Sequence, residues 1–384
     1  MSIKQCPVCK EKIRSRRYLF CPICGFRLDY KASKGEQELD KIKYLWEREE
    51  GGRFLYKNFK SVQNIGVMLY KNTKLIRMNL GDFAHIYLLN LRHFSFLYQV
   101  PDFTQELYKI GKLIGYYSAY ESIKIKRLWR IFGILTRTAF FCKILENKRI
   151  QNISKEGWQR TGAANINLIE IDKKRKIVRY SLEDSFESIF ENISKPTCIV
   201  ETGILCGFLE ALSNHFCGGF ETKCRSTGNP NCEVEIHLHE KEIEPNLPQL
   251  TKDDLDRILD KIVDYIIKKK EVKRKNMSEY KYFACVQPTN YFLVSLSPGH
   301  GIISKYSGRI CGERIAEKAN IHGLDNAIDY SRDLFLYLKV GILEEPQKVL
   351  ERIFIEMSES VYASGVKNIH NELCIYLAGL ISGL

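Results

Sequence analysis

The sequence lacks any long hydrophobic run. No stretch of its 384 residues reaches the roughly 18 consecutive apolar residues that a membrane span needs. The first residues, MSIKQCPVC, contain no apolar core of the kind found in a signal peptide. With 45% hydrophobic and 27% charged residues, the composition is typical of a globular protein with a real core. We therefore expect a cytoplasmic protein that has no membrane partner.

The sequence also lacks the usual catalytic signatures. It has no Gly-x-Gly-x-x-Gly motif at a strand-to-helix junction, and the glycines on either side of His300 form an isolated turn. A phosphate loop, a nucleophile elbow and the helical motif of zinc proteases are missing as well. These absences predict that the protein is not an enzyme.

The charge balance is strongly basic, with a formal net charge of +13. Two interpretations are open: an acidic partner such as nucleic acid, or lysines spread over solvated faces. Only residues 10–17 and 268–275 concentrate the positive charge. We favour the second interpretation and keep nucleic acid as an alternative partner.

The N-terminal segment carries a metal motif. Thirteen cysteines without a signal peptide favour metal ligands over disulfides. Cys6 and Cys9, then Cys21 and Cys24, form two Cys-x2-Cys turns, and so short a segment needs a metal to fold. Residues 4–28 resemble the zinc-ribbon family, which implies a Zn²⁺ ion held by these four thiolates. Contact with a protein partner is the favoured use, and contact with nucleic acid is the alternative.

Apolar periodicity divides the rest of the chain. Helical patterns cover residues 108–122 and 127–145, and alternating residues 166–171 and 177–182 predict a hairpin. A helix from about 198 to 214 and a second hairpin, residues 220–239, follow. The predicted organisation is a zinc ribbon at 1–30, a connector at 31–70, a mixed α/β domain at 71–240, a helical linker with a basic end at 241–275, and a second, incomplete domain at 276–384.

The last segment repeats several glycine and cysteine spacings of the central domain. Gly203 and Gly207 follow Cys198 at the same distances at which Gly379 and Gly383 follow Cys374. The Gly-x3-Gly pair at 111–115 likewise matches the pair at 308–312. Glycines four apart share one helical face and permit close packing. These matches predict an internal repeat, and with it a pseudo-dimer or a homodimer.

A second metal site is predicted in the central domain. Cys224 and Cys232 are predicted to lie on the two strands of the second hairpin, across its tight turn, and Glu221 precedes Cys224 by three residues. Cys198, at the start of the preceding helix, completes a set of four ligands. Three thiolates and one carboxylate suit Zn²⁺ and leave no open position, which indicates a structural site. His237 and His239 are alternatives to Glu221, although solvated strand positions suit them better.

The order Cys…Gly-x3-Gly…Glu-x2-Cys-x7-Cys resembles the 4-vinyl-reductase domain. The resemblance implies an α/β (α+β) fold of the nitric-oxide-signalling and Golgi-transport superfamily, in two copies. It implies that Cys198, Glu221, Cys224 and Cys232 hold zinc, giving two Zn²⁺ ions per chain with the ribbon. It also implies a buried pocket for a small hydrophobic ligand, and hence a sensor or adaptor.

The sequence departs from this pattern in two ways. The second copy keeps Cys374 but has no counterparts of the other three ligands. The first copy shows no clear His and Trp pair for a phenol, although His215, Trp129 and Trp158 are available. A ligand-free assembly scaffold and a zinc-ribbon regulator that binds nucleic acid are therefore the alternative functions.

Overall fold

The computed structural model describes most of the chain from residue 57 onward. The described residues are 57–60, 75–122, 145–213, 215–239, 245, 247–283, 286–295, 298–349, 352–367 and 372–384, with two short strands near the N-terminus. The predicted connector at 31–70 and the helix at 127–145 fall almost entirely outside these ranges. Within them, no helix is both long enough and apolar enough to cross a membrane.

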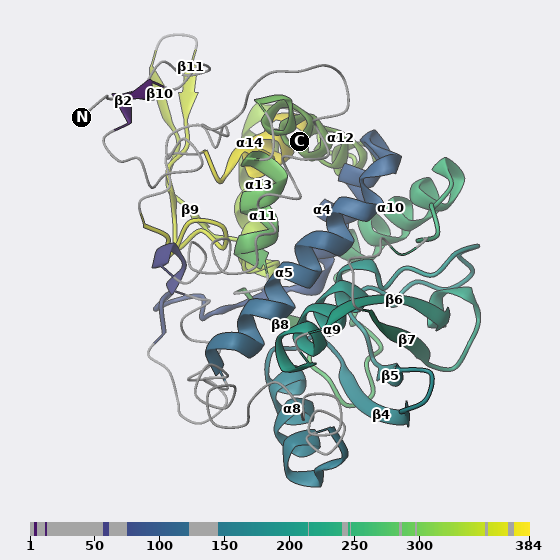
Figure 1. Cartoon of the computed structure of the whole chain (residues 1–384). Coiled ribbons are helices and arrows are strands. Elements are labelled where there is room, and N and C mark those ends of the chain that lie inside the picture. The colour runs from purple at the N-terminus through teal and green to yellow at the C-terminus, as the bar shows by residue number, and fades with distance from the viewer. Residues whose placement is uncertain are drawn as a thin grey trace.

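Helices and short antiparallel sheets alternate along the chain (Figure 1), which confirms a mixed α/β fold. The helices, in chain order, are α4 (Ile86–Gln99), η1 (Pro101–Phe103), α5 (Thr104–Ser122), α8 (Lys148–Arg160), α9 (Ile199–Ser213), η3 (Arg225–Thr227), α10 (Lys252–Ile267), α11 (Val286–Ser295), α12 (Pro298–Ala319), α13 (Leu324–Tyr337) and α14 (Ile375–Gly383). The strands are β1 (Lys4–Gln5), β2 (Lys12–Ile13), β3 (Phe83–His85), β4 (Asn165–Asp172), β5 (Ile177–Glu183), β6 (Phe216–Lys223), β7 (Cys232–His239), β8 (Tyr280–Tyr282), β9 (Ile342–Leu343), β10 (Gln347–Val349), β11 (Arg352–Phe354) and β12 (Met357–Ser358).

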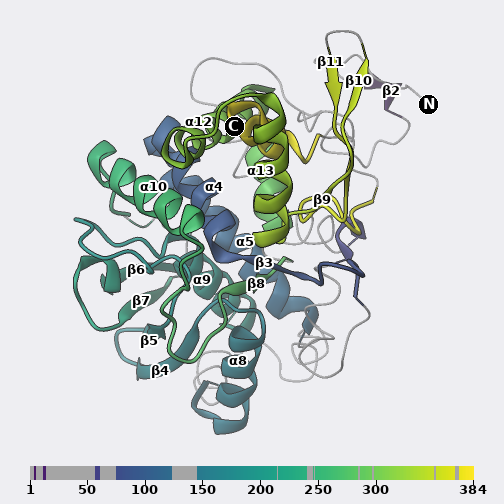
Figure 2. The same ribbon diagram turned by 180° about the vertical axis from the view of Figure 1, so that it is seen from behind.

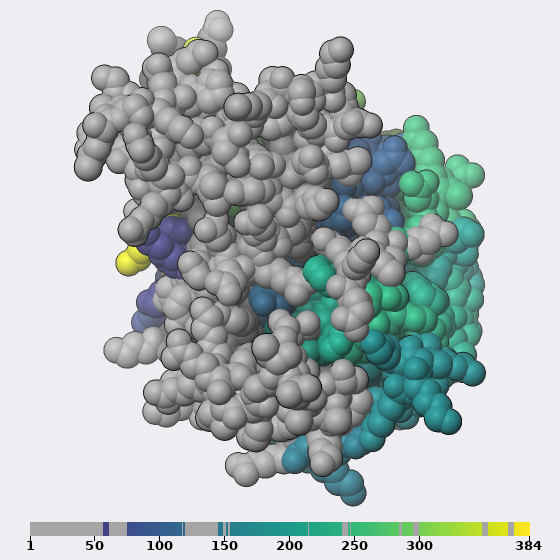
Figure 3. Space-filling model, viewed as in Figure 1, coloured from purple at the N-terminus to yellow at the C-terminus, as the bar shows by residue number. Residues whose placement is uncertain are grey.

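Both predicted hairpins belong to one antiparallel sheet with the strand order β4-β5-β7-β6. Alternate residues of β7 are buried because successive side chains point to opposite faces of a strand. The buried positions are Cys232, Val234, Ile236 and Leu238. Helix α9 packs against β6 on one side and against α5 on the other, which explains why it is apolar all round. With α10, the sheet forms one continuous side of the molecule in Figure 3.

The glycines of α5 and α9 let the two helices touch along their backbones. A methyl group at Gly111 would overlap the carbonyl group of Val200, and one at Gly203 would overlap the carbonyl of Tyr108. Any larger side chain would force the helices apart. The predicted close packing of the glycine faces is confirmed.

Helices α12 and α14 meet through equivalent contacts. A methyl group at Gly308 would overlap the carbonyl of Tyr376, and one at Gly379 would overlap the carbonyl of Lys305. Gly379 stands at the same offset within α14 as Gly203 within α9, and Gly308 and Gly312 of α12 have the same spacing as Gly111 and Gly115 of α5. The second half, here residues 272–384, therefore matches the helix pair of the first half, residues 75–239.

Strands β3 and β8 join the two halves. They pair antiparallel, with Ala84 opposite Lys281 at the centre, and Figure 2 shows them side by side. Beyond the pair, His85 N donates to the Leu338 carbonyl and Tyr282 N donates to the Thr161 carbonyl. Each half thus donates one further backbone hydrogen bond from its strand to the other half.

A buried arginine precedes each of these strands and donates hydrogen bonds to backbone carbonyls of the other half. Arg77 precedes β3, and its Nη1 donates to the carbonyl oxygens of Lys339, at 2.7 Å, and Glu359, at 3.4 Å. Lys339 and Glu359 both have a positive φ, which turns their carbonyls inward. The side chain of Glu359 accepts from the backbone N–H of Asn79 at 2.9 Å.

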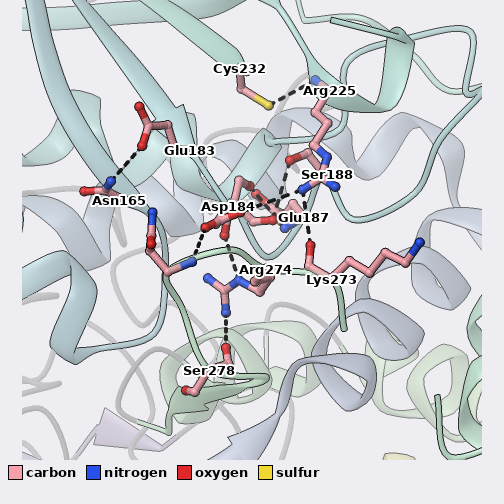
Figure 4. Close-up of polar contacts among 12 residues, drawn as sticks. Asn165, Glu183, Asp184, Glu187, Ser188, Arg225, Cys232, Lys273, Arg274 and Ser278 are labelled. Carbon is pink, nitrogen blue, oxygen red and sulfur yellow. Dashed lines mark hydrogen bonds and ion pairs between the residues drawn. The ribbon is translucent and has the colours of Figure 1, made fainter. Parts of the chain in front are cut away.

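Arg274 is the counterpart before β8. Its Nε donates to the carbonyl of Asp184 at 2.7 Å and its Nη2 to that of Gly162 at 2.9 Å, and both of these residues again have a positive φ. Figure 4 shows the guanidinium pointing toward Asp184 and Ser278. Arg274 belongs to the basic run at 268–275, and its side chain is buried where the two halves meet.

Helix α10 fills the predicted linker and begins as expected. Thr251 caps it by accepting from the backbone N–H of Asp254 at 3.1 Å. Its apolar face packs against α4, and acidic residues on its other face pair with Arg314 and Lys318 of α12. The linker helix is therefore part of the contact between the halves.

Candidate metal centre and the buried polar cluster beside it

The N-terminal cysteines Cys6, Cys9, Cys21 and Cys24 lie outside the described residues. The strands around the first pair are described: β1 and β2 pair antiparallel, with Lys4 opposite Ile13. A hairpin therefore brackets the segment that holds Cys6 and Cys9. The zinc ribbon itself stays a prediction.

The four predicted ligands of the central domain come together. One ligand atom from each of Cys198, Glu221, Cys224 and Cys232 can be chosen so that all lie within 4.8 Å of one another. The Sγ atom of Cys232 lies 3.4 Å from that of Cys198 and 3.6 Å from that of Cys224. These separations are close to the roughly 3.7 Å between thiolates on a tetrahedral Zn²⁺ ion with bonds of about 2.3 Å.

Three elements position these ligands. Cys198 directly precedes α9, Glu221 lies on β6 and Cys232 begins β7. Cys224 follows β6 and is the residue before the short helix η3, so the prediction that it lies on a strand is wrong. The chain leaves β6 for the short helix η3 and ends that helix at Gly228, whose φ of 93° favours glycine. The β6–β7 connection therefore begins at Cys224.

Glu221 leaves one oxygen for a metal. Its Oε2 accepts from the backbone N–H of Cys198 at 2.8 Å, whereas Oε1 is buried and has no partner among the described residues. Burial raises the pKa of the Glu221 carboxyl and of the Cys198 thiol well above their usual values. A divalent cation would reverse this preference by stabilising the ionised forms. The donor set therefore fits Zn²⁺.

Hydrogen bonds around the ligands hold the centre in place. The Ser185 hydroxyl lies 3.2 Å from the Cys198 sulfur, and the Ser226 hydroxyl lies 3.0 Å from that of Cys224. The backbone N–H of Arg225 donates to the Cys232 sulfur at 3.3 Å. Hydrogen bonds of this kind orient metal ligands and stabilise thiolates.

A cluster of buried ionisable groups lies beside this centre. Glu187 accepts the backbone N–H groups of Glu201, at 2.9 Å, and Val200, at 3.3 Å, in the first turn of α9. Ser185 donates to Glu201, and Nδ1 of His93 lies 3.8 Å from Oε1 of Glu187. Each of these ionisable side chains is at most 4% exposed, so this end of α9 is both sealed and polar.

Burial controls the charges in this cluster. It raises the pKa of Glu187 to about 7 and that of Glu201 to about 8, and it lowers the pKa of His93 to about 3. Lys281 of the second half supplies a cation, with Nζ 3.2 Å from the centroid of the Phe186 ring. Oε1 of Glu201 and Nδ1 of His93 complete no hydrogen bond within the described structure. The cluster can therefore accept further polar contacts.

Sequence patterns gave only a weak sign of this cluster. Two glutamates, Glu201 and Glu210, interrupt the apolar run of α9, and each is at most 3% exposed. That interruption was the available signal. Nothing near Lys281 or His93 in the sequence indicates that they approach Glu187, because the contact depends on how β8 and α4 pack.

The other singled-out residues lie away from the centre. The His237 ring is 2.8 Å from Glu235 and stacks on His239, so these histidines do not join the four ligands. His215 contacts the Ser213 carbonyl at the end of α9, and Trp158 is a core residue. Trp129 lies outside the described residues.

One family profile matches part of the central domain. Residues 178–238 match the profile of the 4-vinyl-reductase domain, and this segment contains all four ligands of the candidate metal centre. No curated protein sequence matches the chain. Among solved structures, the chain is similar to the phenol-responsive sensory domain of the transcription activator PoxR with phenol, at 16% identity and a TM-score of 0.30. That similarity covers 40% of this chain and 74% of the other.

Proposed function

We propose that the chain is a non-catalytic sensor or adaptor that binds a small, mostly apolar molecule in its first half. The observation that carries this proposal is the buried cluster of His93, Glu187, Glu201 and Lys281. It combines unpartnered polar atoms with an aromatic neighbour, Phe186. An apolar body and one hydroxyl group would satisfy such surroundings, since buried pockets bind through apolar contact and a few polar anchors.

The position of the cluster favours a signalling role. Lys281 comes from the second half, whereas His93 and the two glutamates come from the first. A ligand that contacts both sides would bind one relative arrangement of the halves better than another. Differential binding of this kind shifts a conformational equilibrium, and the ribbon or α10 would transmit the change to a protein partner.

We propose Zn²⁺ as the occupant of the candidate metal centre and a second Zn²⁺ in the N-terminal ribbon. Cys198, Glu221, Cys224 and Cys232 would fill a tetrahedral shell and leave no position for a catalytic water. The ion would fasten the β6–β7 hairpin to the start of α9. Its role in this proposal is structural.

We further propose that the second half is an incomplete copy of the 4-vinyl-reductase domain, so that one chain forms a pseudo-dimer. The matched glycine contacts and the matched arginine contacts support it. A further match is the Ser360 hydroxyl, which lies 3.2 Å from the Cys374 sulfur, as Ser185 does from Cys198.

Native mass spectrometry of the full-length chain tests the proposal. We expect two zinc ions and one added organic mass, with the organic mass lost in His93→Leu and retained in the exposed control His322→Leu. Both variants should keep both zinc ions. Two zinc ions without an organic mass would favour a ligand-free scaffold. One zinc ion that is lost when residues 1–28 are removed would rule out the central zinc site.

A further inference from the structure

Arg92 is a buried cation that reaches from the first half into the second. It lies on α4, which packs against α12, and its side chain is 2% exposed. The guanidinium donates to the side-chain oxygen of Asn290 and, at 3.5 Å, to Ser304 Oγ. It also lies over the rings of Tyr362, at 4.8 Å, and Tyr376, at 5.4 Å.

No carboxylate among the described residues pairs with Arg92. Its electrostatic neighbours are Tyr362, Tyr376 and Cys374, and burial lowers its pKa. The two other buried arginines differ: Arg77 has nearby carboxylates, and so does Arg274. An unpaired buried charge is strongly destabilising, and arginine stays protonated in proteins. The charge of Arg92 therefore calls for an anion that the described chain does not supply.

Several donors around Arg92 are also unused. Nε of Arg92 and Oγ of Ser307 are buried and complete no hydrogen bond within the described residues. The buried hydroxyls of Tyr362 and Tyr376 approach Arg92 and the pair Ser95 and Cys311, respectively, without normal hydrogen-bond geometry. Ser307 lies one helical turn beyond Ser304 on α12. Burial raises the pKa of Tyr362 to about 12, so this phenol keeps its proton and can donate it in a hydrogen bond. A site made of one cation and several hydroxyl donors suits an acceptor that carries negative charge.

The first half shows the opposite chemistry at the matching position. Glu187 directly follows Phe186, whose N–H bonds the Ala163 carbonyl; Tyr362 directly follows Val361, whose N–H bonds the Val340 carbonyl. A phenol thus replaces a carboxylate. Leu377 stands three residues after Cys374, as Glu201 does after Cys198. The second half therefore has no built-in anions where the first has two.

We propose that the second half binds a small anion at Arg92, between α4, α12, Tyr362 and Tyr376 of α14. The ligand is either an organic carboxylate or a small inorganic anion. A carboxylate would form a bidentate pair with the guanidinium and accept from the phenol hydroxyls. This site uses other side chains than the cluster at Glu187, and it does not depend on the function proposed for that cluster.

Equilibrium dialysis of the full-length protein against labelled acetate, benzoate and chloride tests the site. Long dialysis is needed because Arg92 is sealed and the anion must wait for an opening motion. We expect one saturable site in the wild type and in Arg309→Met, which removes an exposed arginine of the neighbouring helix α12. Arg92→Met should abolish this binding. Selective uptake of acetate or benzoate would identify an organic carboxylate, and uptake of chloride alone an inorganic anion.

Two milder variants keep the test decisive if Arg92→Met fails to fold. Tyr362→Phe and Tyr376→Phe retain the cation and the ring, and each should weaken binding by about 10-fold through the loss of one hydrogen bond to a charged group. The absence of saturable binding of all three anions to the wild type would overturn the proposal. Equal affinity in the wild type and both phenylalanine variants would also overturn it.

Discussion

The two halves of this chain share a frame, meaning their glycine contacts between helices and their buried arginine contacts. They differ in that, among the described residues, only the first half has the set of candidate metal ligands. In both, glycine-faced helices touch along their backbones, and a buried arginine binds the carbonyl group of a residue with positive φ in the other half. In the first half, Cys198 meets three further ligands on the β6–β7 hairpin. In the second half, Cys374 keeps only the serine contact. The frame is thus independent of the metal centre.

The uncovered side of α14 shows what the hairpin does. Thr202 and Cys206 of α9 are buried, whereas Ala378 and Ser382, at the same offsets from Cys374, are exposed. The exposed side of α14 carries small side chains at these positions, Ala378 and Ser382. The strands that cover a helix and the candidate metal ligands are therefore found together, in the first half.

Removing a ligand of the candidate metal centre should give the largest difference in stability between a substitution in the first half and its counterpart in the second. Cys232→Ser should release one zinc ion and lower the free energy of unfolding by about 4 kcal/mol, the value for free zinc at about 1,000 times its Kd. Cys374→Ser, which alters the counterpart of Cys198, should cost less than about 1 kcal/mol. Urea denaturation and zinc analysis measure both. Equal losses would mean that the centre holds no metal.

The glycine contacts should be equally important in both halves. Gly111→Ala and Gly308→Ala should each destabilise the fold by about 3 kcal/mol, because the new methyl group overlaps a backbone carbonyl. Gly301→Ala is the control on α12, since its methyl group would lie 3.6 Å from Ile375 Cδ1, an ordinary contact. Thermal unfolding compares the three. A tolerated Gly308→Ala would contradict the matched packing of α12 and α14.

The pH dependence should distinguish the two buried clusters. Burial lowers the pKa of His93 to about 3 from an ordinary 6.5, so the unfolded chain binds this proton more readily. The stability that His93 contributes is fully present above pH 6.5 and is lost as the pH drops toward 3. The raised pKa values of Glu187 and Glu201 act in the opposite direction, so the effect of His93 is the difference between the wild type and a His93 variant. At pH 5 the loss is about 2 kcal/mol. His93→Asn should remove this loss, as measured by denaturation at pH 5 and 7, whereas the exposed control His322→Asn should keep it.

The polar contacts between α10 and α12 should matter least. Arg314 pairs with Asp256 and, at 3.0 Å, with Asp260, but both aspartates are about half exposed. Ion pairs at a surface contribute about 0–1 kcal/mol and weaken with salt. Arg314→Gln should therefore cost less than about 1 kcal/mol in chemical denaturation at about 0.15 M salt. A loss above about 2 kcal/mol would show that the ion pairs between α10 and α12 are a major contribution to the stability of the contact between the halves.

Local patterns were sufficient for much of the candidate metal centre. The spacing Glu221-x2-Cys224-x7-Cys232 indicated a hairpin that brings its ends together, and the helix after Cys198 followed from apolar periodicity. The exact element of Cys224 was predicted incorrectly, because strand ends depend on turn geometry more than on alternation. The ion itself remains a prediction.

The buried polar clusters could not be predicted in this way. Arg92, Glu187 and Glu201 look like ordinary surface residues in a list of charges, and only the packing places them inside. Arg274 is the plainest example, since it lies within a basic run and yet binds three carbonyls of the first half. A run of charged residues describes only the local composition, whereas the burial of each side chain depends on which distant segments pack against it.

The sequence by itself determined the elements whose information is local: the glycine-faced helices, the hairpins, the cap of α10 and the set of four ligands. Tertiary structure alone decided how the halves exchange their contacts, which charges are buried, and that Glu187 and Tyr362 occupy matching places. The physical reason is range. Periodicity and turns act over a few residues, whereas a buried charge depends on partners far away in the chain, such as Asn290 for Arg92.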